Sequence, residues 1–475
     1  MPSTKHTEFQ KFKEEIQEIR SLIVRGMADR AEEKLAKIST SISHLERDQR
    51  TILEIDMLTL LGRMATQKGK INQGIDILSD ALSFAESANY AEGIAEIMIN
   101  LGNVQWELGE DVELAREYFQ EALAICTQNQ DKGGMAKCLN GLGVVDLLLG
   151  AYKDALYHFQ EYKIISRELG NRLGESIALN NTAEVYRLQG ELDNAEINYK
   201  GSLKICHEIR DYDGVILCHI NLGWVKWGQN DLVAAINHLQ QALEDSKTFK
   251  VGWATRIENL VALAGVLTDL AKTKTQDYSE SEKLLEKALN YAQSIGSPSS
   301  IALCRYFQGY LERTRGNLAR AEKLFSKCLT EGSNFDIMTK SLLGSAEILL
   351  TRYVRTSEEK YLEEFMKQIN KARKLAKENQ LLVMLCEIHV LRGLVAASKN
   401  NYEEALAHLT QAVSLAEEKS LFRQKERAEK EFENILKQRR MEKIETGTLE
   451  DEDALKYIQN YLKDVTEILK RRKGN

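Results

Sequence analysis

A chain of 475 residues is longer than one compact hydrophobic core usually supports, so we expect several domains or an elongated stack of repeats. Lys and Arg number 64 and Asp and Glu number 71, and the resulting net charge of −7, with both signs interspersed, argues against nucleic acid as a ligand. No stretch reaches the ~20 apolar residues of a membrane span, and the N-terminal residues lack the apolar region of a signal peptide. We therefore expect a cytoplasmic protein without a membrane partner.

Helices are expected along the whole chain. Ala, Leu, Glu and Lys dominate the sequence, and the only prolines are Pro2 and Pro298. Residues 1–48 are predicted to form an N-terminal capping helix pair. In this pair Gly26 and Ala31 are the first copy of a spacing that recurs further along the chain.

A repeat of about 40 residues fills the predicted array over residues 49–421. In each copy a turn residue is followed five positions later by a small residue. The pairs include Gly69 and Gly74, Gly150 and Ala155, Gly190 and Ala195, Asn230 and Ala235, Gly316 and Ala321, and Asn400 and Ala405. Upstream of the turn lie Leu61-Gly62, Leu101-Gly102, Leu142-Gly143, Thr182-Ala183 and Leu222-Gly223, and downstream lie Phe119 with Ala122, Tyr199 with Ser202, Leu239 with Ala242, and Phe325 with Cys328. This constant order predicts a helix A, a tight turn and a helix B, with the small residues allowing close helix packing.

Helix starts and cysteines follow the same period. Short oxygen-bearing residues suited to helix N-caps precede a glycine by three positions, and these are Asp131, Asn171 and Asp211 before Gly134, Gly174 and Gly214. Glycine inside a helix costs up to about 1 kcal/mol relative to alanine, so its recurrence predicts close contact with a neighbouring helix. Cys126 and Cys206, like Cys138 and Cys218, are 80 residues apart, which indicates repeated packing positions rather than a metal or redox site.

Two regions follow the predicted array. Residues 422–445 are rich in charge and suit a solvated capping helix that closes the last repeat. Residues 446–475 are expected to form a short linker and an amphipathic helix with apolar residues at Leu455, Ile458, Leu462, Val465 and Leu469. This helix either folds back on the array, pairs with a second chain to form a homodimer, or occupies a groove.

These motifs together resemble the tetratricopeptide repeat (TPR) family over about residues 8–420. The resemblance implies an all-α fold, a right-handed superhelical α-solenoid of antiparallel helix hairpins. The period is similar to that of Pins-type spindle-orientation adaptors, kinesin light chains and Rap-type peptide receptors, and Asn100-Leu101-Gly102-Asn103 is similar to the N-L-G-N runs of the Pins type. Neither a GoLoco-like arginine motif nor an N-terminal helix-turn-helix domain is visible, so the biology of those families is not carried over.

In TPR arrays the helix A surface lines a concave groove, and the resemblance places nine residues on or near it. They are Asn100, Asn103, Asn140, Asn180, Asn181, Glu184, Arg187, Asn221 and Trp224. Asparagine carries a donor and an acceptor, so a ladder of such side chains suits the backbone of an extended peptide. Glu184 and Arg187 would select charge, and Trp224 would anchor an aromatic or apolar residue. The alternative is that some asparagines bond the adjacent helix and fix the repeat geometry.

No set of acids, bases or metal ligands converges in the sequence, so we expect no enzymatic activity, no metal and no cofactor. His158, His238 and His408 recur at one position of helix B, which indicates a packing or surface role. The expected function is a protein–protein interaction scaffold that binds a peptide or helix of a partner protein in its concave groove. The alternative is a regulatory receptor of the Rap-like type that responds to a small molecule or a signalling peptide.

Overall fold

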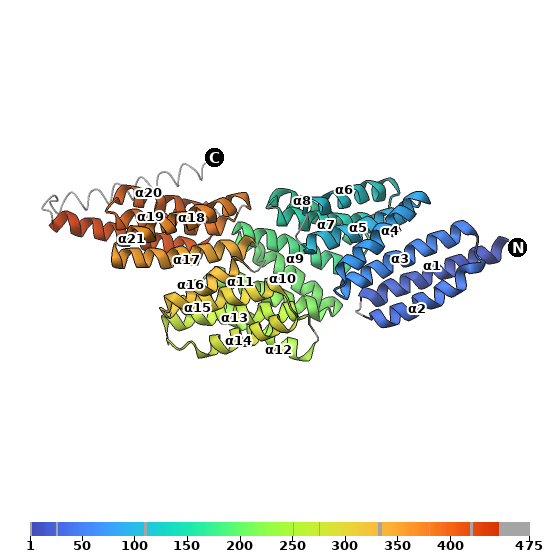
Figure 1. The fold of residues 1–475 in the computed structure, drawn as a ribbon, viewed down its shortest axis with the longest axis horizontal. Helices are drawn as coiled ribbons and strands as arrows, with labels where there is room; N and C mark the ends of the chain where they lie inside the picture. The colour runs from blue at the N-terminus through green and yellow to red at the C-terminus, as the bar shows by residue number, and fades with distance from the viewer. Residues whose placement is uncertain are drawn as a thin grey trace. The chain divides into compact units, whose positions relative to one another are not determined.

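The structure is a computed structural model that describes residues 2–24, 27–108, 112–249, 251–274, 276–330, 335–379, 381–418 and 421–445. Within these ranges the chain forms α-helices, one 3-10 turn and no β-strand (Figure 1). The all-α prediction is therefore confirmed. The predicted amphipathic helix over 455–469 lies outside the described residues.

The described chain divides into two compact units. Unit 1 comprises described residues of 1–185 and 197–218, and unit 2 comprises described residues of 186–196 and 219–445. Unit 1 contains α1 (Pro2–Val24), α2 (Ala28–Ser41), η1 (Ile42–His44), α3 (Arg47–Gln67), α4 (Ile71–Ser87), α5 (Ala91–Leu108), α6 (Val112–Gln128), α7 (Lys132–Leu148) and α8 (Tyr152–Glu168). Residues of α9 (Arg172–Gln189), α10 (Leu192–Ile209) and α11 (Tyr212–Gly228) belong to both units. Unit 2 contains α12 (Leu232–Thr248), α13 (Trp253–Thr273), α14 (Ser279–Ser294), α15 (Pro298–Thr314), α16 (Leu318–Cys328), α17 (Phe335–Thr356), α18 (Glu359–Glu378), α19 (Leu382–Ser398), α20 (Tyr402–Glu418) and α21 (Phe422–Glu445).

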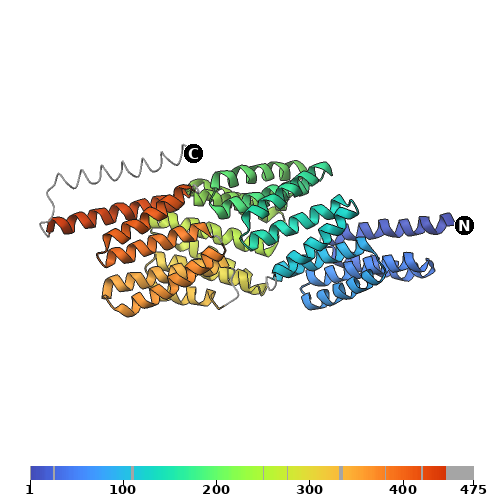
Figure 2. The same ribbon diagram turned by 90° about the horizontal axis from the view of Figure 1, so that it is seen from above.

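Consecutive helices pair as hairpins inside each unit. In unit 1, α3 packs on α4, α5 on α6 and α7 on α8, and in unit 2, α13 packs on α14, α15 on α16, α17 on α18 and α19 on α20 (Figure 2). The odd-numbered members are the predicted helices A, and the even-numbered members are the helices B. Each hairpin buries its apolar side against the next, which is the packing that the repeat predicts.

Glycines bring helix A and helix B together. A Cβ atom at Gly102 would lie 2.9 Å from the Phe119 ring, and one at Gly223 would lie 2.6 Å from Leu239. Carbon atoms in contact are normally ~3.5–4.0 Å apart, so a side chain at either position would force Phe119 or Leu239 to shift. Phe119 also lies against Gly141 of the following helix A, where a Cβ would lie 2.5 Å from its ring. One aromatic side chain thus fills the space between two hairpins.

The turns within hairpins use residues that tolerate positive φ. Gly69, Gly150 and Gly316 have φ of 78°, 73° and 87°, and Asn230 and Asn400 have φ of 62° and 59°. Glycine, and after it asparagine, adopts this left-handed conformation most readily. The turn positions read from the sequence are therefore confirmed.

The predicted N-caps are also confirmed. The Asp131 carboxylate accepts a hydrogen bond from the Gly134 N–H at 3.0 Å, and Asp211 accepts one from Gly214 at 3.1 Å. A Cβ at Gly134 would lie 2.4 Å from the Cys126 sulfur, so this glycine is needed for contact with the preceding helix. All seven cysteines are buried, as the packing interpretation predicts.

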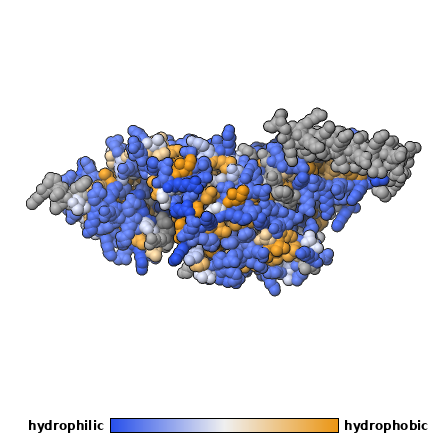
Figure 3. Space-filling model, turned by 180° about the vertical axis from the view of Figure 1, so that it is seen from behind, coloured by the Kyte–Doolittle hydropathy of each residue, from blue (hydrophilic) through white to orange (hydrophobic). Residues whose placement is uncertain are grey.

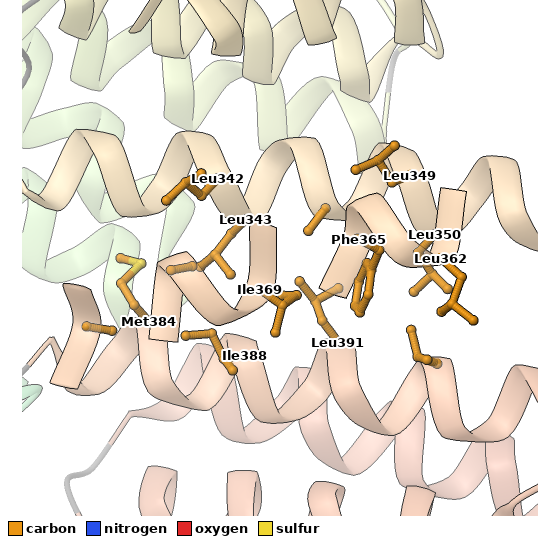
Figure 4. Packing of buried hydrophobic residues seen from close by; sticks show 14 of the residues in the cluster. Leu342, Leu343, Leu349, Leu350, Leu362, Phe365, Ile369, Met384, Ile388 and Leu391 are labelled. Carbon is orange, nitrogen blue, oxygen red and sulfur yellow. The ribbon is translucent and has the colours of Figure 1, made fainter. Parts of the chain in front are cut away.

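In unit 2 an apolar core lies between α17, α18 and α19. Phe365 and Ile369 of α18 are fully buried there, beside Leu342 of α17 and Leu391 of α19. Figure 4 shows these side chains directed into the space between the helices. This core holds the helix A surfaces of α17 and α19 in fixed positions, which matters for the groove described below.

Candidate peptide-binding grooves

Unit 1 carries a pocket of about 540 Å³ on its helix A surfaces. Its lining includes Asn100 and Asn103 of α5 and Asn140 of α7, together with Arg63 of α3 and Glu96 of α5. The structure therefore brings three of the sequence-predicted site residues into one pocket. All three asparagines are half-buried, so each keeps part of its side chain in contact with solvent.

Each pocket asparagine uses only part of its hydrogen-bonding capacity. Asn100 donates to the Glu96 carbonyl at 2.8 Å, and the Asn103 oxygen accepts from the Trp106 indole at 3.3 Å. The Asn140 oxygen accepts from the Asn181 amide at 3.0 Å. An asparagine amide offers two donors and one acceptor oxygen, so each residue retains polar groups that a ligand can reach. The ladder thus fixes neighbouring helices and still presents polar groups to the pocket.

The charged residues of this pocket are partly desolvated. Arg20 pairs with Glu96 at 2.5 Å, and Arg63 lies near the same carboxylate. Burial lowers the pKa of Arg63, while the Glu96 charge opposes this shift.

The remaining site residues proposed from the sequence do not line the unit 1 pocket. In unit 1 the Tyr199 hydroxyl donates to Glu184 at 2.6 Å, so this carboxylate contacts helix B. In unit 2 Asn221 is buried, with 8% of its surface exposed, which favours a packing role for it. Asn180 is half-buried, and only Arg187 and Trp224 line the groove of unit 2.

The groove of unit 2 is larger, with a volume of about 1550 Å³. It is lined mainly by α11, α13, α15, α17 and α19, which are helices A, and by α21. Trp224 stacks on Trp227 with ring centroids 5.3 Å apart, and both lie near Phe307, at 5.9 and 6.1 Å. Trp227 and Phe307 are buried, whereas Trp224 is partly exposed. These rings form an aromatic floor for the groove.

Polar groups of the groove lining are joined to this floor by hydrogen bonds. The Trp227 indole donates to Asp269 at 2.8 Å, and the Tyr310 hydroxyl donates to the same carboxylate. Sequence reasoning proposed Trp224 but missed Trp227, Phe307 and Tyr310. The aromatic run at Tyr306, Phe307 and Tyr310 in one helix A was a signal that could have found them.

An ion-pair network crosses the groove and includes α21. Arg427 donates to Glu387 of α19 and to Glu347 of α17, both at 2.5 Å. Glu347 also pairs with Arg313 of α15. Burial lowers the pKa of Arg313. The charged helix over 422–445, expected to be a solvated cap, therefore packs its apolar side on α20 and turns a second side into the groove.

Asn230 adds a contact between distant parts of unit 2. Its amide donates to Glu426 of α21 at 2.9 Å, across 196 residues of sequence. The helix α21 is thus tied at its start to the α11–α12 turn as well as to α17 and α19. No part of the sequence pattern around Glu426 indicated this pairing.

Outside the two pockets, the features of the described residues that could carry chemistry are metal-ligand clusters and the recurring histidines. No cluster of His, Cys, Asp and Glu suited to a metal ion occurs among the described residues. Of the recurring histidines, His158 bonds Asp146 at 2.7 Å, and His238 lies 3.0 Å from His219.

None of the described helices is both long and apolar enough to cross a bilayer. The face in Figure 3 is mostly hydrophilic, with apolar residues in small separate patches.

Comparison with known proteins identifies the class. Residues 107–424 match the family described as the MalT-like TPR region, and residues 53–128 match a tetratricopeptide repeat family. Together with the glycine-spaced hairpins, these matches define a tetratricopeptide-type helical repeat protein. The chain belongs to the MalT-like TPR family.

Curated relatives match only over short stretches. The Tonsoku-like protein of Drosophila melanogaster is 26% identical over 190 residues, which are 35% of this chain and 13% of that protein. A TPR repeat-containing protein of Dictyostelium discoideum is 30% identical over 144 residues, which are 29% of this chain and 8% of that protein. The chain therefore matches a small part of each relative's length.

Solved structures show the same fold over most of the chain. A Rap protein complexed with competence and sporulation factor and the apo form of RapI each have a TM-score of 0.56, at 14% and 15% identity. Each match covers 78% of this chain and 99% of the other chain. The predicted solenoid of helix hairpins is therefore confirmed at the level of the fold.

Proposed function

We propose that this chain is a non-enzymatic interaction scaffold and that the groove of unit 2 binds a peptide segment or a helix of another protein. The observation that supports this most strongly is the aromatic floor of Trp224, Trp227 and Phe307 in a groove of about 1550 Å³. Large aromatic residues in concave sites are the usual anchors of protein interfaces. Arg187 lines the same groove and contributes a positive charge to it.

The asparagine pocket of unit 1 is proposed as a second contact surface. The polar groups of Asn100, Asn103 and Asn140 that have no partner among the described residues suit the N–H and C=O groups of an extended backbone. Backbone recognition of this kind carries little sequence preference, so specificity would come from the aromatic groove. Asn180, Asn181, Glu184 and Asn221 then serve mainly to position helices.

The fold supports a polypeptide partner by analogy. TPR-type repeats commonly present helix A surfaces to partner proteins, and a structural neighbour of this chain was solved with competence and sporulation factor bound. At this low sequence identity, the similarity supports a shared fold and does not support a shared ligand. The proposal therefore rests on the residues of this groove.

The test is an affinity selection of a random peptide display library on the intact chain. Enriched peptides are then measured by fluorescence anisotropy against the chain, Trp224→Ala and Trp253→Ala. Trp253 is a matched control because it is a half-exposed tryptophan of unit 2 that packs on Tyr291 outside the groove lining. We expect Trp224→Ala to weaken binding at least about tenfold and Trp253→Ala to leave it unchanged. Failure to enrich any peptide, or equal binding by both variants, contradicts the proposal.

A second candidate function is a peptide-responsive regulator. It is favoured by one observation, that Asn230 and Arg427 tie α21 to helices far apart in unit 2, so ligand entry beside α21 would disturb these contacts. Small-angle scattering with and without a selected peptide separates the two functions. A passive scaffold keeps its scattering profile, whereas a regulator changes it.

A further inference from the structure

The groove of unit 2 differs in charge from the chain as a whole. Eight of its lining residues are Lys or Arg and five are Asp or Glu, a surplus of three positive charges, whereas the chain carries a net −7. A concave surface of opposite sign to the rest of the protein concentrates its field on an incoming ligand.

The carboxylates of the groove are already engaged within the protein. Glu347 and Glu387 accept from Arg427, and Asp269 accepts from the Trp227 indole. Glu426 accepts from Asn230, and Glu431 accepts from Asn434 at 3.3 Å. Arg427 therefore neutralises Glu347 and Glu387, and the other three carboxylates each accept a hydrogen bond within the protein.

Three basic residues of the lining have no ion-pair partner among the described residues. They are Arg355 near the end of α17, and Lys430 and Lys437 on α21, and all three are exposed. Lys430 and Lys437 are seven residues apart, so they lie on one side of the helix about 10.5 Å apart. A partner that matches them carries carboxylates at about that spacing, which is three residues apart in an extended strand or seven in a helix.

The aromatic floor adds a second requirement. Trp224 is the partly exposed member of the stack with Trp227, and Phe307 lies near both rings. An apolar or aromatic partner side chain suits Trp224, because stacking on the indole ring removes apolar surface of both groups from water.

We propose that the groove of unit 2 selects an acidic segment of a partner protein that carries one large apolar or aromatic residue. The carboxylates of this segment pair with Lys430 and Lys437, and the apolar residue covers Trp224. This inference rests on the proposed function, because it specifies the partner of the same groove. A nucleic acid fits less well, since its continuous row of phosphates would approach a chain whose net charge is −7.

The test compares three synthetic peptides that share one tryptophan and the same length and differ only in having Glu, Gln or Lys at the charged positions. Binding to the intact chain is measured by fluorescence anisotropy at low and high salt, with a labelled oligo(dT) as a fourth probe. We expect the Glu peptide to bind at least about tenfold more tightly than the Lys peptide, and its affinity to fall as salt rises. Lys430→Glu with Lys437→Glu is expected to weaken the Glu peptide at least about tenfold and to strengthen the Lys peptide.

The matched control is Lys323→Glu with Lys327→Glu on α16. These lysines are exposed in unit 2, lie outside the groove lining and have no ion-pair partner among the described residues, and their reversal is expected to leave the Glu peptide unaffected. Equal binding of the three peptides, an equal effect of both double variants, or tighter binding of oligo(dT) overturns the inference. If library peptides still bind the groove without charge preference, the proposed function stands and only this inference fails.

Discussion

Phe119 offers the clearest test of how the hairpins are held together. Its side chain is fully buried and lies between Gly102 of its own hairpin and Gly141 of the next. Replacing Phe119 by alanine removes the ring from a space that glycine backbone borders at two places. No side chain at these two positions can move into the cavity, so the site relaxes poorly.

Phe→Ala substitutions in protein cores cost about 3–5 kcal/mol, and a cavity that cannot collapse belongs at the upper end. We therefore expect Phe119→Ala to lower the free energy of unfolding of unit 1 by about 4–5 kcal/mol, and Phe119→Leu by about 1 kcal/mol. The assay is urea unfolding followed by circular dichroism, with hydrogen exchange of α5, α6 and α7 to localise the loss.

Phe335→Ala is the control, because Phe335 is 51% exposed and its truncation should cost at most about 0.5 kcal/mol. A loss below about 1 kcal/mol for Phe119→Ala, or faster exchange spread evenly over both units, would refute the packing account. Phe325 lies between Gly309 and Gly344 in unit 2 in the same way, so Phe325→Ala should repeat the result there.

Four further outcomes follow from single contacts. Asp131→Ala removes an N-cap and should cost about 1 kcal/mol in urea unfolding, whereas Asp131→Asn keeps the acceptor and should cost little. Gly223→Val forces a side chain into Leu239 and should lower the free energy of unfolding by about 1–3 kcal/mol. An unchanged free energy of unfolding would mean that the two helices can separate without cost. Arg427→Met leaves Glu387 without its cation and should speed hydrogen exchange in α21, while unchanged exchange would show that packing alone holds this helix. Burial and neighbouring positive groups lower the pKa of His389 to about 4 in the folded chain, whereas a histidine in the unfolded chain has a pKa of about 6.5. Between about pH 6.5 and about pH 4 the unfolded chain therefore binds a proton at this residue that the folded chain does not. Stability should therefore fall as pH drops from about 6.5 to 4, by about 1–3 kcal/mol for this group, and His389→Gln should flatten that slope in pH-dependent melting.

The repeat could be read from the sequence because its signals are local. Each hairpin needs a small residue where two helices cross, and a residue tolerant of positive φ where the chain turns, such as Gly102 and Gly150. These requirements recur about every 40 residues, so the positions can be recognised from the sequence without the tertiary structure. The N-cap at Asp131 is local in the same sense.

The groove could be predicted only in part because its residues come from distant helices. Trp224 was identified as a helix A aromatic, but its partners Phe307 and Arg427 of the groove lining lie 83 and 203 residues further along the chain. Their proximity depends on how successive hairpins rotate against each other, which no local spacing records. Asn221 was placed on or near the groove from its position on helix A, and its buried side chain shows that this position alone does not fix how far a residue is exposed.

The most direct test of the central claim is hydrogen exchange of the intact chain with and without a saturating selected peptide. Binding in the groove of unit 2 predicts slower exchange in α15, in α21 and in residues 219–228 of α11, with α14, α18 and α20, which contribute no residue to the groove lining, unchanged. Protection confined to those three helices B, with α11, α15 and α21 unaffected, would contradict the claim that the helix A surface holds the partner.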